Sequence, residues 1–381
     1  MKILHIITAP AAGGAEMYIK DLAKSLLSQG HSVHIGFLGK AGDIGRSQDF
    51  ERSFLTELAD AGVKFFFIGS ASRSFPWLGA LRVRRYVKEE NIDIYHAHLS
   101  YGIVFGSLIR IPRIYTHHNA KMRVSRSVFN ILKIWIDELV AISSLCGRAL
   151  SEFSGRDVTV IRNGIDLTKI IRKQVIVDRP AQLIRCVAVG GITKQKNYNL
   201  LVAAVERIPA GVRSRLLISI AGEGPQAETY ELRKAVQKTG LGDLIELLGN
   251  VDDIPALLNQ SDLFLMSSAW EGLPIALIEA TSSGLPCIVS DVGGCREVID
   301  TCKNGLVVGP DNAQALADAI ECLVKTPARL TEYSDNALKY SSEFSIERAC
   351  EGHLALYAKL LSNRLSLAVS HTKQDVPRLI A

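Results

Sequence analysis

Short apolar runs alternate with amphipathic segments along most of the chain. The first run, Ile3 to Thr8, leads through a glycine-containing loop into a segment whose apolar residues have helical spacing: Ile19, Leu22, Ala23, Leu26 and Leu27. Gly30 is placed to end this helix, and a second run follows at Val33 to Leu38. Because short, nearly continuous apolar runs are typical of strands covered on both faces, the pattern predicts a parallel sheet flanked by helices.

This rhythm continues over the whole chain with one interruption. Further strands are predicted in the first half at 63–68, 92–95, 114–116, 139–142 and 158–161, and in the second half at 184–189, 216–221, 245–247, 263–266, 287–289 and 306–308. Around residues 165–182 the sequence is charged and aperiodic, which favours a linker. We therefore predict an α/β fold of two doubly wound, Rossmann-like domains at 1–172 and 183–344, with ligands outside the carboxyl ends of their strands.

Composition narrows the class of protein. Apolar residues make up 48% and charged residues 22% of the 381 residues, as in a soluble globular protein. The N-terminal apolar run is too short for a signal peptide, and no stretch reaches the roughly 18 apolar residues of a membrane span, so we expect a cytoplasmic protein. The seven cysteines are scattered without a Cys-x-x-Cys pair, which argues against a disulfide framework and a zinc site.

Charge is unevenly divided between the two halves. Residues 1–180 carry 25 Lys and Arg against 16 Asp and Glu, a net +9, whereas the remainder carries 19 against 23, a net −4. A basic N-terminal half indicates an anionic partner, which could be a phosphorylated substrate, an acidic membrane surface or a nucleic acid. Nucleic acid is disfavoured because the chain has no recognisable binding module and its second half is acidic.

One segment mixes cations with bulky apolar residues at near-helical spacing, from Lys121 to Trp135. Residues of the same kind precede it in the chain: Phe75, Trp77, Arg82, Arg84 and Arg85. One interpretation is a peripheral contact with an anionic inner-leaflet membrane. The other is a globular helix whose apolar face belongs to the core while its cations are solvated, and the sequence does not decide between the two.

The segment from Ser267 to Ala280 carries the most specific chemistry. It follows a predicted strand, and Pro274 fits the first turn of a helix. The unpaired N–H groups at the start of that helix would face the cleft, where they could hold a diphosphate without a metal. Glu271 then lies in the loop and Glu279 just over one turn inside the helix, so the two carboxylates could hold two parts of one hydroxyl-rich ligand.

A Glu, seven residues and a second Glu, with Gly272, Leu273 and Pro274 after the first, resembles the signature of glycosyltransferase family 4. Neighbouring blocks agree in order along nearly the whole chain: NGID at 163–166, AGEGP at 221–225, LGN at 248–250, residues 283–299 and NGLV at 304–307. The resemblance implies the GT-B fold, in which two Rossmann-like domains face each other across a central cleft. It also implies that a helix at about 345–361 packs back on the first domain, leaving 362–381 as a tail.

By this resemblance, Glu279 binds the ribose hydroxyls of the donor nucleotide, and Glu271 contacts the transferred sugar near the reacting carbon. Gly222, Gly224 and Pro225 would line the base pocket, and the Gly-Leu-Pro after Glu271 would complete the donor site. Taken alone, Glu271 would be interpreted as a solvated loop carboxylate. The agreement of the surrounding blocks reverses that interpretation.

The family also places a basic pair after the first strand of the second domain, where it grips the donor diphosphate. Here Lys196 stands at the lysine position, but Gly191 stands where an arginine is usual. Lys194, or the backbone N–H groups of Gly190 and Gly191, could supply the missing donor. The alternative is that both lysines are solvated loop charges, and weakened or altered donor binding follows if the arginine is not replaced.

The loop after the first strand contains Gly13 and Gly14, which would let a ligand approach the backbone at a helix N-terminus. By resemblance, this loop approaches the donor phosphate and the acceptor, and Asn163 belongs to the same acceptor and phosphate region. The alternative is an ordinary strand-to-helix turn. Neither this loop nor 222–224 completes Gly-x-Gly-x-x-Gly, which argues against a nicotinamide cofactor.

Histidines gather at predicted strand ends: His96, His98, His117 and His118. They invite a metal site, but no carboxylate or Cys completes a known ligand spacing, so we expect satisfied strand-end histidines and no metal. By resemblance, a histidine lies near the transferred sugar. His118 matches it best, with His117 as the fallback and His98 on the acceptor side.

The resemblance thus implies a retaining, metal-independent hexosyltransferase that uses a nucleotide-sugar, taken to be a UDP-sugar, and no further cofactor. The acceptor would be a glycan or a polyprenyl-diphosphate-linked sugar, by analogy with relatives that build lipopolysaccharide, O-antigen or capsule. Retention could proceed through a covalent nucleophile or by front-side attack, and the sequence does not choose. The alternatives are a sugar-nucleotide epimerase or hydrolase of the same fold, and a catalytically impaired nucleotide-sugar-binding scaffold.

Overall fold

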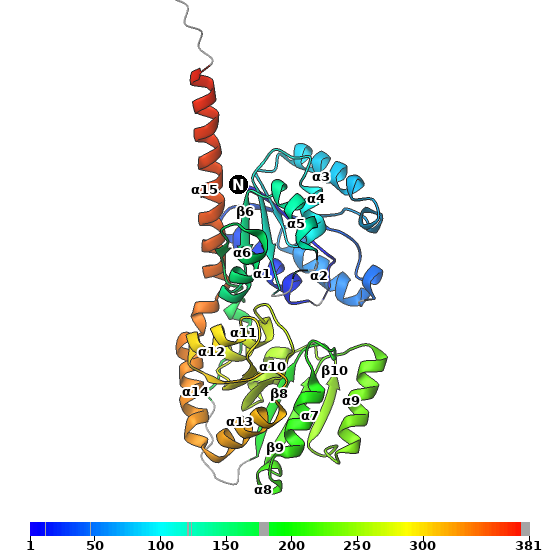
Figure 1. Cartoon of the computed structure of the whole chain (residues 1–381), viewed down its shortest axis with the longest axis vertical. Coiled ribbons are helices and arrows are strands. Elements are labelled where there is room, and N and C mark those ends of the chain that lie inside the picture. Colours follow the sequence, from blue (N-terminus) through cyan, green and yellow to red (C-terminus); the bar gives the residue numbers. More distant parts are fainter. Residues whose placement is uncertain (12, 46, 120–121, 123, 175–182, 375–381) are drawn as a thin grey trace, which may run out of the picture.

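The protein consists of two α/β units, each built on its own parallel sheet (Figure 1). The computed structural model describes residues 1–374 except 12, 46, 120–121, 123 and 175–182, with side chains described up to residue 364 apart from that of Ile44. Parts of the predicted linker and tail, at 175–182 and 375–381, therefore lie outside the described residues, as do Lys121 and Arg123 of the cationic segment. In the part of the chain that is described, no helix has the length and apolar character needed to cross a membrane.

The N-terminal unit contains a seven-stranded sheet in the order β3-β2-β1-β4-β5-β6-β7, and all its neighbouring strands are parallel. The strands are β1 (Lys2–Ile7), β2 (Ser32–Phe37), β3 (Lys64–Phe67), β4 (Ile94–Ala97), β5 (Arg113–His117), β6 (Glu138–Ala141) and β7 (Thr159–Val160). The helices are α1 (Gly14–Ser28), α2 (Gln48–Asp60), α3 (Pro76–Glu90), α4 (Ser100–Phe105), α5 (Arg126–Leu132) and α6 (Ser144–Ser154). The strand order reverses between β1 and β4, which is where doubly wound sheets bind ligands.

The C-terminal unit repeats this design with a six-stranded parallel sheet in the order β10-β9-β8-β11-β12-β13. The strands are β8 (Ile184–Val189), β9 (Leu216–Ala221), β10 (Ile245–Gly249), β11 (Leu263–Met266), β12 (Cys287–Ser290) and β13 (Gly305–Val308). The helices are α7 (Tyr198–Arg207), α8 (Ala210–Arg213), α9 (Gln226–Lys238), α10 (Ile254–Asn259), α11 (Ile275–Ser282), α12 (Cys295–Cys302), α13 (Ala313–Lys325) and α14 (Pro327–Tyr340). The order reverses between β8 and β11.

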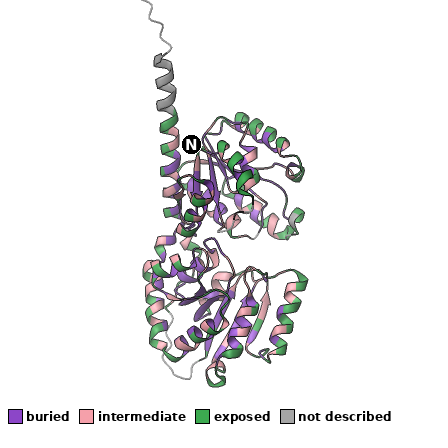
Figure 2. Ribbon diagram, viewed as in Figure 1, coloured by how far each residue is buried: buried purple, intermediate pink, exposed green. Residues whose placement is uncertain are grey.

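The strands form the centre of each unit, and the outer helix faces are exposed (Figure 2). Every residue of β11 and β12 is buried, as expected for strands covered on both faces. On α1 the predicted apolar stripe is buried as well, including Ile19, Leu22 and Leu26. Full burial of such a side chain contributes about 1.5 to 3 kcal/mol. The predicted fold of two doubly wound, Rossmann-like units is therefore confirmed, and β8, β9 and β11 have the predicted bounds.

Two local features differ from the sequence expectation. Pro274 is the N-cap residue of α11, one position before the helical turn in which it was expected. The last helix, α15 (Ile346–Gln374), continues well beyond residue 361 and packs against α1 of the N-terminal unit (Figure 1). No Gly or Pro occurs between residues 362 and 374, so the sequence contains no residue that would stop the helix there.

The polypeptide passes between the two units twice, and the two passages lie side by side. Ile165 N donates to the carbonyl of Phe344 at 3.0 Å, and Ile346 N donates to the carbonyl of Ile165 at 2.8 Å. Gly164 permits this approach, because a Cβ at that position would overlap the carbonyl oxygen of Ser345. The connection is therefore a paired crossing rather than a single linker.

Candidate functional site

The carboxyl ends of the two sheets meet at the boundary between the units. A Cβ on Gly14, after β1, would lie 3.5 Å from Cγ1 of Ile275 at the start of α11. The loop after β11 comes closer still to the loop after β5, because a Cβ on Gly272 would overlap the carbonyl oxygen of His118. Residues predicted from separate parts of the sequence thus lie at one boundary, at the strand ends where ligands of such sheets bind.

Glu271 is a buried carboxylate of this region, held by three side-chain hydrogen bonds. It is only 5% exposed. Lys196 Nζ lies 2.7 Å from its Oε1, Ser268 Oγ donates to the same oxygen at 2.8 Å, and Gln195 Nε2 donates to Oε2 at 3.1 Å. The carboxylate is therefore not a solvated loop charge: three donors fix its position after β11.

The loop after β8 brings Lys196, and not Lys194, to this carboxylate. The backbone of Gly190 has a φ of 146°, and a Cβ there would overlap the side chain of Lys196, so the lysine stem passes directly over this glycine. Lys194 is exposed and makes no side-chain hydrogen bond or ion pair with the described residues. Gly191 is half-buried, and a Cβ there would lie 3.1 Å from the carbonyl oxygen of Glu223.

The glycines predicted for the base pocket have a packing role in this structure. A Cβ on Gly222 would overlap the carbonyl oxygen of Gly190, and one on Gly224 would overlap that of Ile192. Ile192 N donates to the carbonyl of Glu223 at 2.9 Å, which joins the two loops. Pro225 follows as the N-cap residue of α9. The loops after β8 and β9 are thus locked together, and the base-binding role of these residues stays a prediction.

Glu279 is the fifth residue of α11 and is half-buried. Burial raises its pKa to about 7; the negative charge of Asp21 contributes to the rise, and Lys169 opposes it. Asp21 is itself paired with Lys169, whose Nζ lies 2.6 Å from Oδ1. The Glu279 carboxyl makes no hydrogen bond with the described residues, which leaves it available to a hydroxyl-bearing ligand.

The helices α1 and α11 both begin at the boundary, but only one of them offers an open N-terminus. Gly13, the N-cap of α1, lies against the carboxylate of Glu16, because a Cβ there would overlap Oε2. The first turn of α11 contains no acidic residue, and its N-cap, Pro274, supplies no side-chain cap. The backbone N–H groups at the start of α11 therefore remain as an anion-binding end of a helix dipole.

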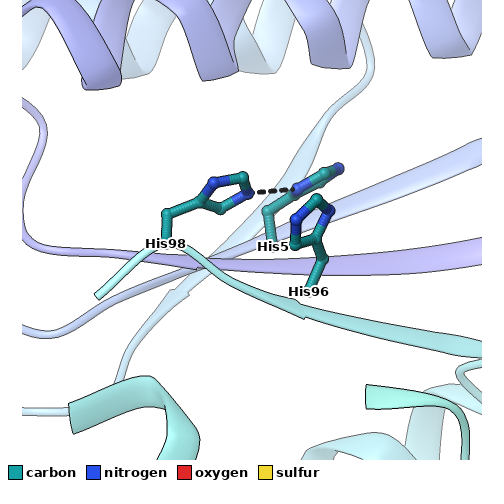
Figure 3. A group of neighbouring side chains, drawn as sticks. All are labelled: His5, His96 and His98. Atoms are coloured by element: carbon teal, nitrogen blue, oxygen red, sulfur yellow. Dashed lines mark hydrogen bonds between the residues drawn. The ribbon is translucent and has the colours of Figure 1, made fainter. Parts of the chain in front are cut away.

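Histidines form a buried cluster next to this boundary. His5, His96 and His98 have ring nitrogens within 4.8 Å of one another, the spacing of a metal-ligand group (Figure 3). The His96 and His98 rings are tilted by 31° to each other, with centroids 4.2 Å apart. His96 is also engaged at both nitrogens, by the Tyr357 hydroxyl at 2.7 Å and the Thr116 hydroxyl at 2.6 Å. A metal ion bound by His96 would therefore have to displace one of these two hydrogen bonds, and the absence of a metal stays a prediction.

The two neighbouring histidines after β5 have different surroundings. His117 Nδ1 lies 3.0 Å from the Tyr115 hydroxyl, within the N-terminal core. His118 Nε2 lies 2.9 Å from Nδ1 of His98, and its backbone carbonyl faces Gly272. The structure therefore brings His118, rather than the fallback His117, to the boundary where Glu271 lies.

Several contacts across the boundary were not anticipated from sequence. Glu297 of α12 accepts from Ser144 N at 2.8 Å and from Arg162 Nε at 2.5 Å. Asn163 Nδ2 donates to the carbonyl of Leu273 at 3.4 Å. Ser268 and Gln195, which hold Glu271, were also missed; their only sequence signal is a position beside a residue already singled out. Apart from Ser268, which lies three residues before Glu271, these contacts join residues more than 70 positions apart, so local pattern could not reveal them.

Comparison with known families divides the chain at the same place as the fold. The family model described as Glycosyltransferase Family 4 matches residues 12–169, and that described as Glycosyl transferases group 1 matches residues 170–340. Together the two models therefore extend over both units.

The chain is also similar to individual proteins. The chain is 25% identical over 299 residues to the Escherichia coli UDP-Gal:alpha-D-GlcNAc-diphosphoundecaprenol alpha-1,3-galactosyltransferase, covering 70% of this chain and 76% of the relative. It is 28% identical over 216 residues to the lipopolysaccharide core biosynthesis mannosyltransferase LpsB of Rhizobium meliloti, covering 53% of this chain and 61% of the relative. The crystal structure of Anabaena Alr3699/HepE in complex with UDP has the same fold, with a TM-score of 0.78 and 20% identity over 94% of this chain and 100% of that one.

Proposed function

Because the chain belongs to glycosyltransferase family 4 and has the GT-B fold, we propose that it transfers a sugar from a UDP-sugar to a lipid-linked or glycan acceptor, with retention of configuration. The UDP donor is supported by the galactosyltransferase relative, whose name specifies UDP-Gal, and by the structural neighbour crystallised with UDP. A polyprenyl-diphosphate acceptor is supported by the same relative, and a role in cell-surface polysaccharide synthesis by the lipopolysaccharide mannosyltransferase.

The observation that carries the proposal is the position of Glu271. Its carboxylate is fixed by Lys196, Ser268 and Gln195 of the C-terminal unit, and the next residue touches the backbone of His118 from the N-terminal unit. A sugar held there would lie between a donor-binding and an acceptor-binding unit. Such apposition of fixed polar groups at a domain boundary is what group transfer between two substrates requires.

The departing nucleoside diphosphate would be stabilised by Lys196 and the N-terminus of α11. Lys196 is cationic and the N-terminus of α11 is positively polarised, and both lie near the Glu271 carboxylate that would contact the sugar. We therefore expect transfer without added divalent metal ions. Complete loss of turnover in a chelator, with recovery on adding magnesium or manganese, would contradict this part of the proposal.

Front-side attack is the stereochemical route that the Glu271 environment supports. Both oxygens of this carboxylate already accept hydrogen bonds, and one of them is paired with a lysine. Donors of this kind stabilise the anion and make it a poor nucleophile. Glu271 would then stabilise positive charge that develops on the sugar, while a phosphate oxygen of the leaving group takes the acceptor proton.

The acceptor would reach the N-terminal unit from a membrane surface. The cationic segment is divided in the structure: Phe129 is buried, whereas Ile131 and Ile134 are 61% and 65% exposed. Trp77 on α3 is 57% exposed. Helix α3 packs against α4 (Figure 1), and both α4 and α5 contact the 3-10 turn at Lys133–Trp135. Exposed apolar side chains among Arg and Lys residues suit the interface of an anionic bilayer.

The decisive experiment is a mass-spectrometric screen of sugar nucleotides against lipid-linked acceptors. Wild type is compared with Glu271→Ala and Glu279→Ala, and Lys194→Ala serves as the matched loop control. A product heavier by one sugar in wild type and the control, with both Glu variants impaired, establishes transfer and identifies the donor. Nucleotide release that is independent of acceptor favours an epimerase or hydrolase, and nucleotide binding without consumption favours a scaffold.

A further inference from the structure

The carboxylate of Glu297 extends from the first turn of α12 and is bound by residues that precede the crossing between the units. Its Oε2 accepts from the backbone N of Ser144 at 2.8 Å. Its Oε1 accepts from the Ser144 hydroxyl at 3.1 Å and from Nε of Arg162 at 2.5 Å. The Glu297 side chain is 13% exposed, against 39% for Arg162. Three donors from before the crossing thus hold a carboxylate of the C-terminal unit.

The partners of Glu297 are suited to a negative charge. Ser144 is the first residue of α6, and the first N–H groups of a helix have no acceptor within the helix and carry the positive end of its dipole. The N-cap, Ser143, caps another amide of the helix with its own hydroxyl. Arg162 adds a full positive charge, and its guanidinium carbon lies 5.8 Å from the centre of the Phe344 ring at the crossing. Glu297 therefore meets a helix dipole and a cation together, unlike an exposed ion pair.

The same end of α12 holds the loop that carries Glu271. Gly294 is the N-cap of α12, and its N donates to the carbonyl of Gly272 at 2.5 Å. Gly293 has a φ of 56°, and a Cβ there would overlap the carbonyl oxygen of Glu271. A Cβ on Gly294 would lie 3.0 Å from Cβ of Ser143. These glycines let the Glu271 loop, the start of α12 and the start of α6 meet backbone to backbone.

Apolar side chains at this place form one cluster that spans the boundary. Ile142 and Cys146 of the N-terminal unit pack together with Leu273 and Cys295 of the C-terminal unit. Apolar contact is non-directional, so it holds the two units together without fixing how they are aligned. The hydrogen bonds of Glu297 are directional, and they supply that alignment.

We propose that Glu297 is a positioning residue that sets the place of the Glu271 loop relative to the N-terminal unit. The first turn of α12 is the connecting element, because it binds α6 and Arg162 through Glu297 and binds the Glu271 loop through Gly294. This alignment depends only on these contacts. Its effect on sugar transfer, through the placing of Glu271, rests on the proposed glycosyltransferase function.

The direct test is hydrogen–deuterium exchange of the ligand-free full chain, followed by mass spectrometry. Residues 271–273 are buried, so a loosened loop will exchange faster. In Glu297→Ala we expect exchange of these amides to be at least roughly tenfold faster, the effect of losing hydrogen bonds to a charged group. Asp300→Ala is the matched control, because it removes an exposed carboxylate one turn further along the same helix and should leave exchange of the loop unchanged.

Three results of this experiment overturn the proposal. Unchanged exchange at residues 271–273 in Glu297→Ala shows that the carboxylate does not hold the loop. An equal rise in Asp300→Ala shows that any lost charge on α12 has the same effect. A rise of the same size in peptides from β1 and β8 shows a loss of stability throughout the protein rather than a loss of alignment.

Kinetics separate alignment from general structural support. Glu297→Ala should lower kcat roughly tenfold to a hundredfold, as a small misplacement of a reacting group does. UDP affinity measured by calorimetry should change by less than about twofold, because Lys196 and Glu279 belong to the C-terminal unit and make no bond to Glu297. Equal losses of kcat and UDP affinity, or an unchanged kcat in a variant whose loop is loosened, overturn the proposed positioning role.

The conservative variant keeps the question decidable if Glu297→Ala does not fold. Glu297→Gln retains an oxygen for the Ser144 amide but loses the charge that faces Arg162, so exchange and kcat should both lie between those of wild type and of Glu297→Ala. Wild-type values of both in Glu297→Gln and in Arg162→Gln overturn the proposal. If the loop loosens as expected but UDP does not bind and no sugar is transferred, the alignment stands and only the proposed function fails.

Discussion

The buried ion pair between Lys196 and Glu271 gives a quantitative prediction. The lysine Nζ lies 2.7 Å from Oε1, and the two side chains are only 16% and 6% exposed. Removing one partner of such a pair leaves an uncompensated buried charge and typically costs about 3 to 5 kcal/mol of folding free energy. Ser268 and Gln195 still donate to the carboxylate in Lys196→Met, so we expect the lower end, about 3 kcal/mol.

A double-mutant cycle isolates the pair. Glu271→Gln leaves the lysine charge without its partner and should cost about 2 to 3 kcal/mol, since the ammonium is the more exposed member. The double variant removes both charges, so its loss of folding free energy should be about 2 kcal/mol smaller than the sum of the two single losses. Lys194→Met makes the same chemical change two residues away at an exposed position, and it should alter stability by less than about 0.5 kcal/mol.

The assay is urea unfolding followed by circular dichroism at neutral pH, with the kcat/KM of each folded variant measured in parallel. Single losses that add within about 0.5 kcal/mol would show that the two side chains are not coupled. A Lys194→Met loss as large as that of Lys196→Met would refute the distinction between the two lysines. Either result would remove the basis for treating Glu271 and Lys196 as one unit of the site.

Three further predictions concern other parts of the boundary and the N-terminal surface. The pKa of Glu279 is raised to about 7, so its carboxylate form is lost as the pH falls through that value. Nucleotide affinity measured by calorimetry should therefore rise with pH through about 7. Asp21→Asn removes a neighbouring negative charge and should move the inflection to lower pH. Gly272→Ala should lower the free energy of unfolding by about 1 to 3 kcal/mol and should also lower kcat, because the added methyl group would overlap a backbone carbonyl of the opposite unit. An unchanged kcat would contradict the close contact. Ile131→Ser should reduce the amount of protein that sediments with phosphatidylglycerol vesicles at low salt. Tyr230 on α9 of the other unit is about as exposed, and Tyr230→Ser should have no such effect. Equal effects of the two substitutions would argue against a specific membrane face.

Much of the fold could be predicted because its determinants are local. The strand at 263–266 is a continuous apolar run, and that at 184–189 is interrupted only by Arg185, since both faces of a parallel sheet are covered. That pattern is visible without any tertiary information. The end of α15 was predicted too early because the expectation came from a family resemblance, whereas the sequence has no Gly or Pro between residues 362 and 374 that would stop the helix.

The candidate site was predictable in part. Glu271, Glu279 and Lys196 were singled out by spacing and resemblance, and the structure brings Lys196 to Glu271. The contact between His5 and His98 was missed, because His5 is an isolated polar residue among apolar ones and nothing near it in sequence shows that His98 lies within hydrogen-bonding distance. Partners of this kind are decided by strand order, which places β4 beside β1, and not by local pattern.

The paired crossing at Ile165 and Ile346 determines how the two units can move against each other. Two stretches of one chain bonded side by side resist sliding and separation, but they allow twisting about their common direction. We therefore expect the two units to move against each other mainly by a twist at this crossing. Because α15 begins at this crossing and packs against α1, we expect the helix to move with the N-terminal unit, so that its position follows the orientation of that unit at the boundary where Glu271 and His118 lie.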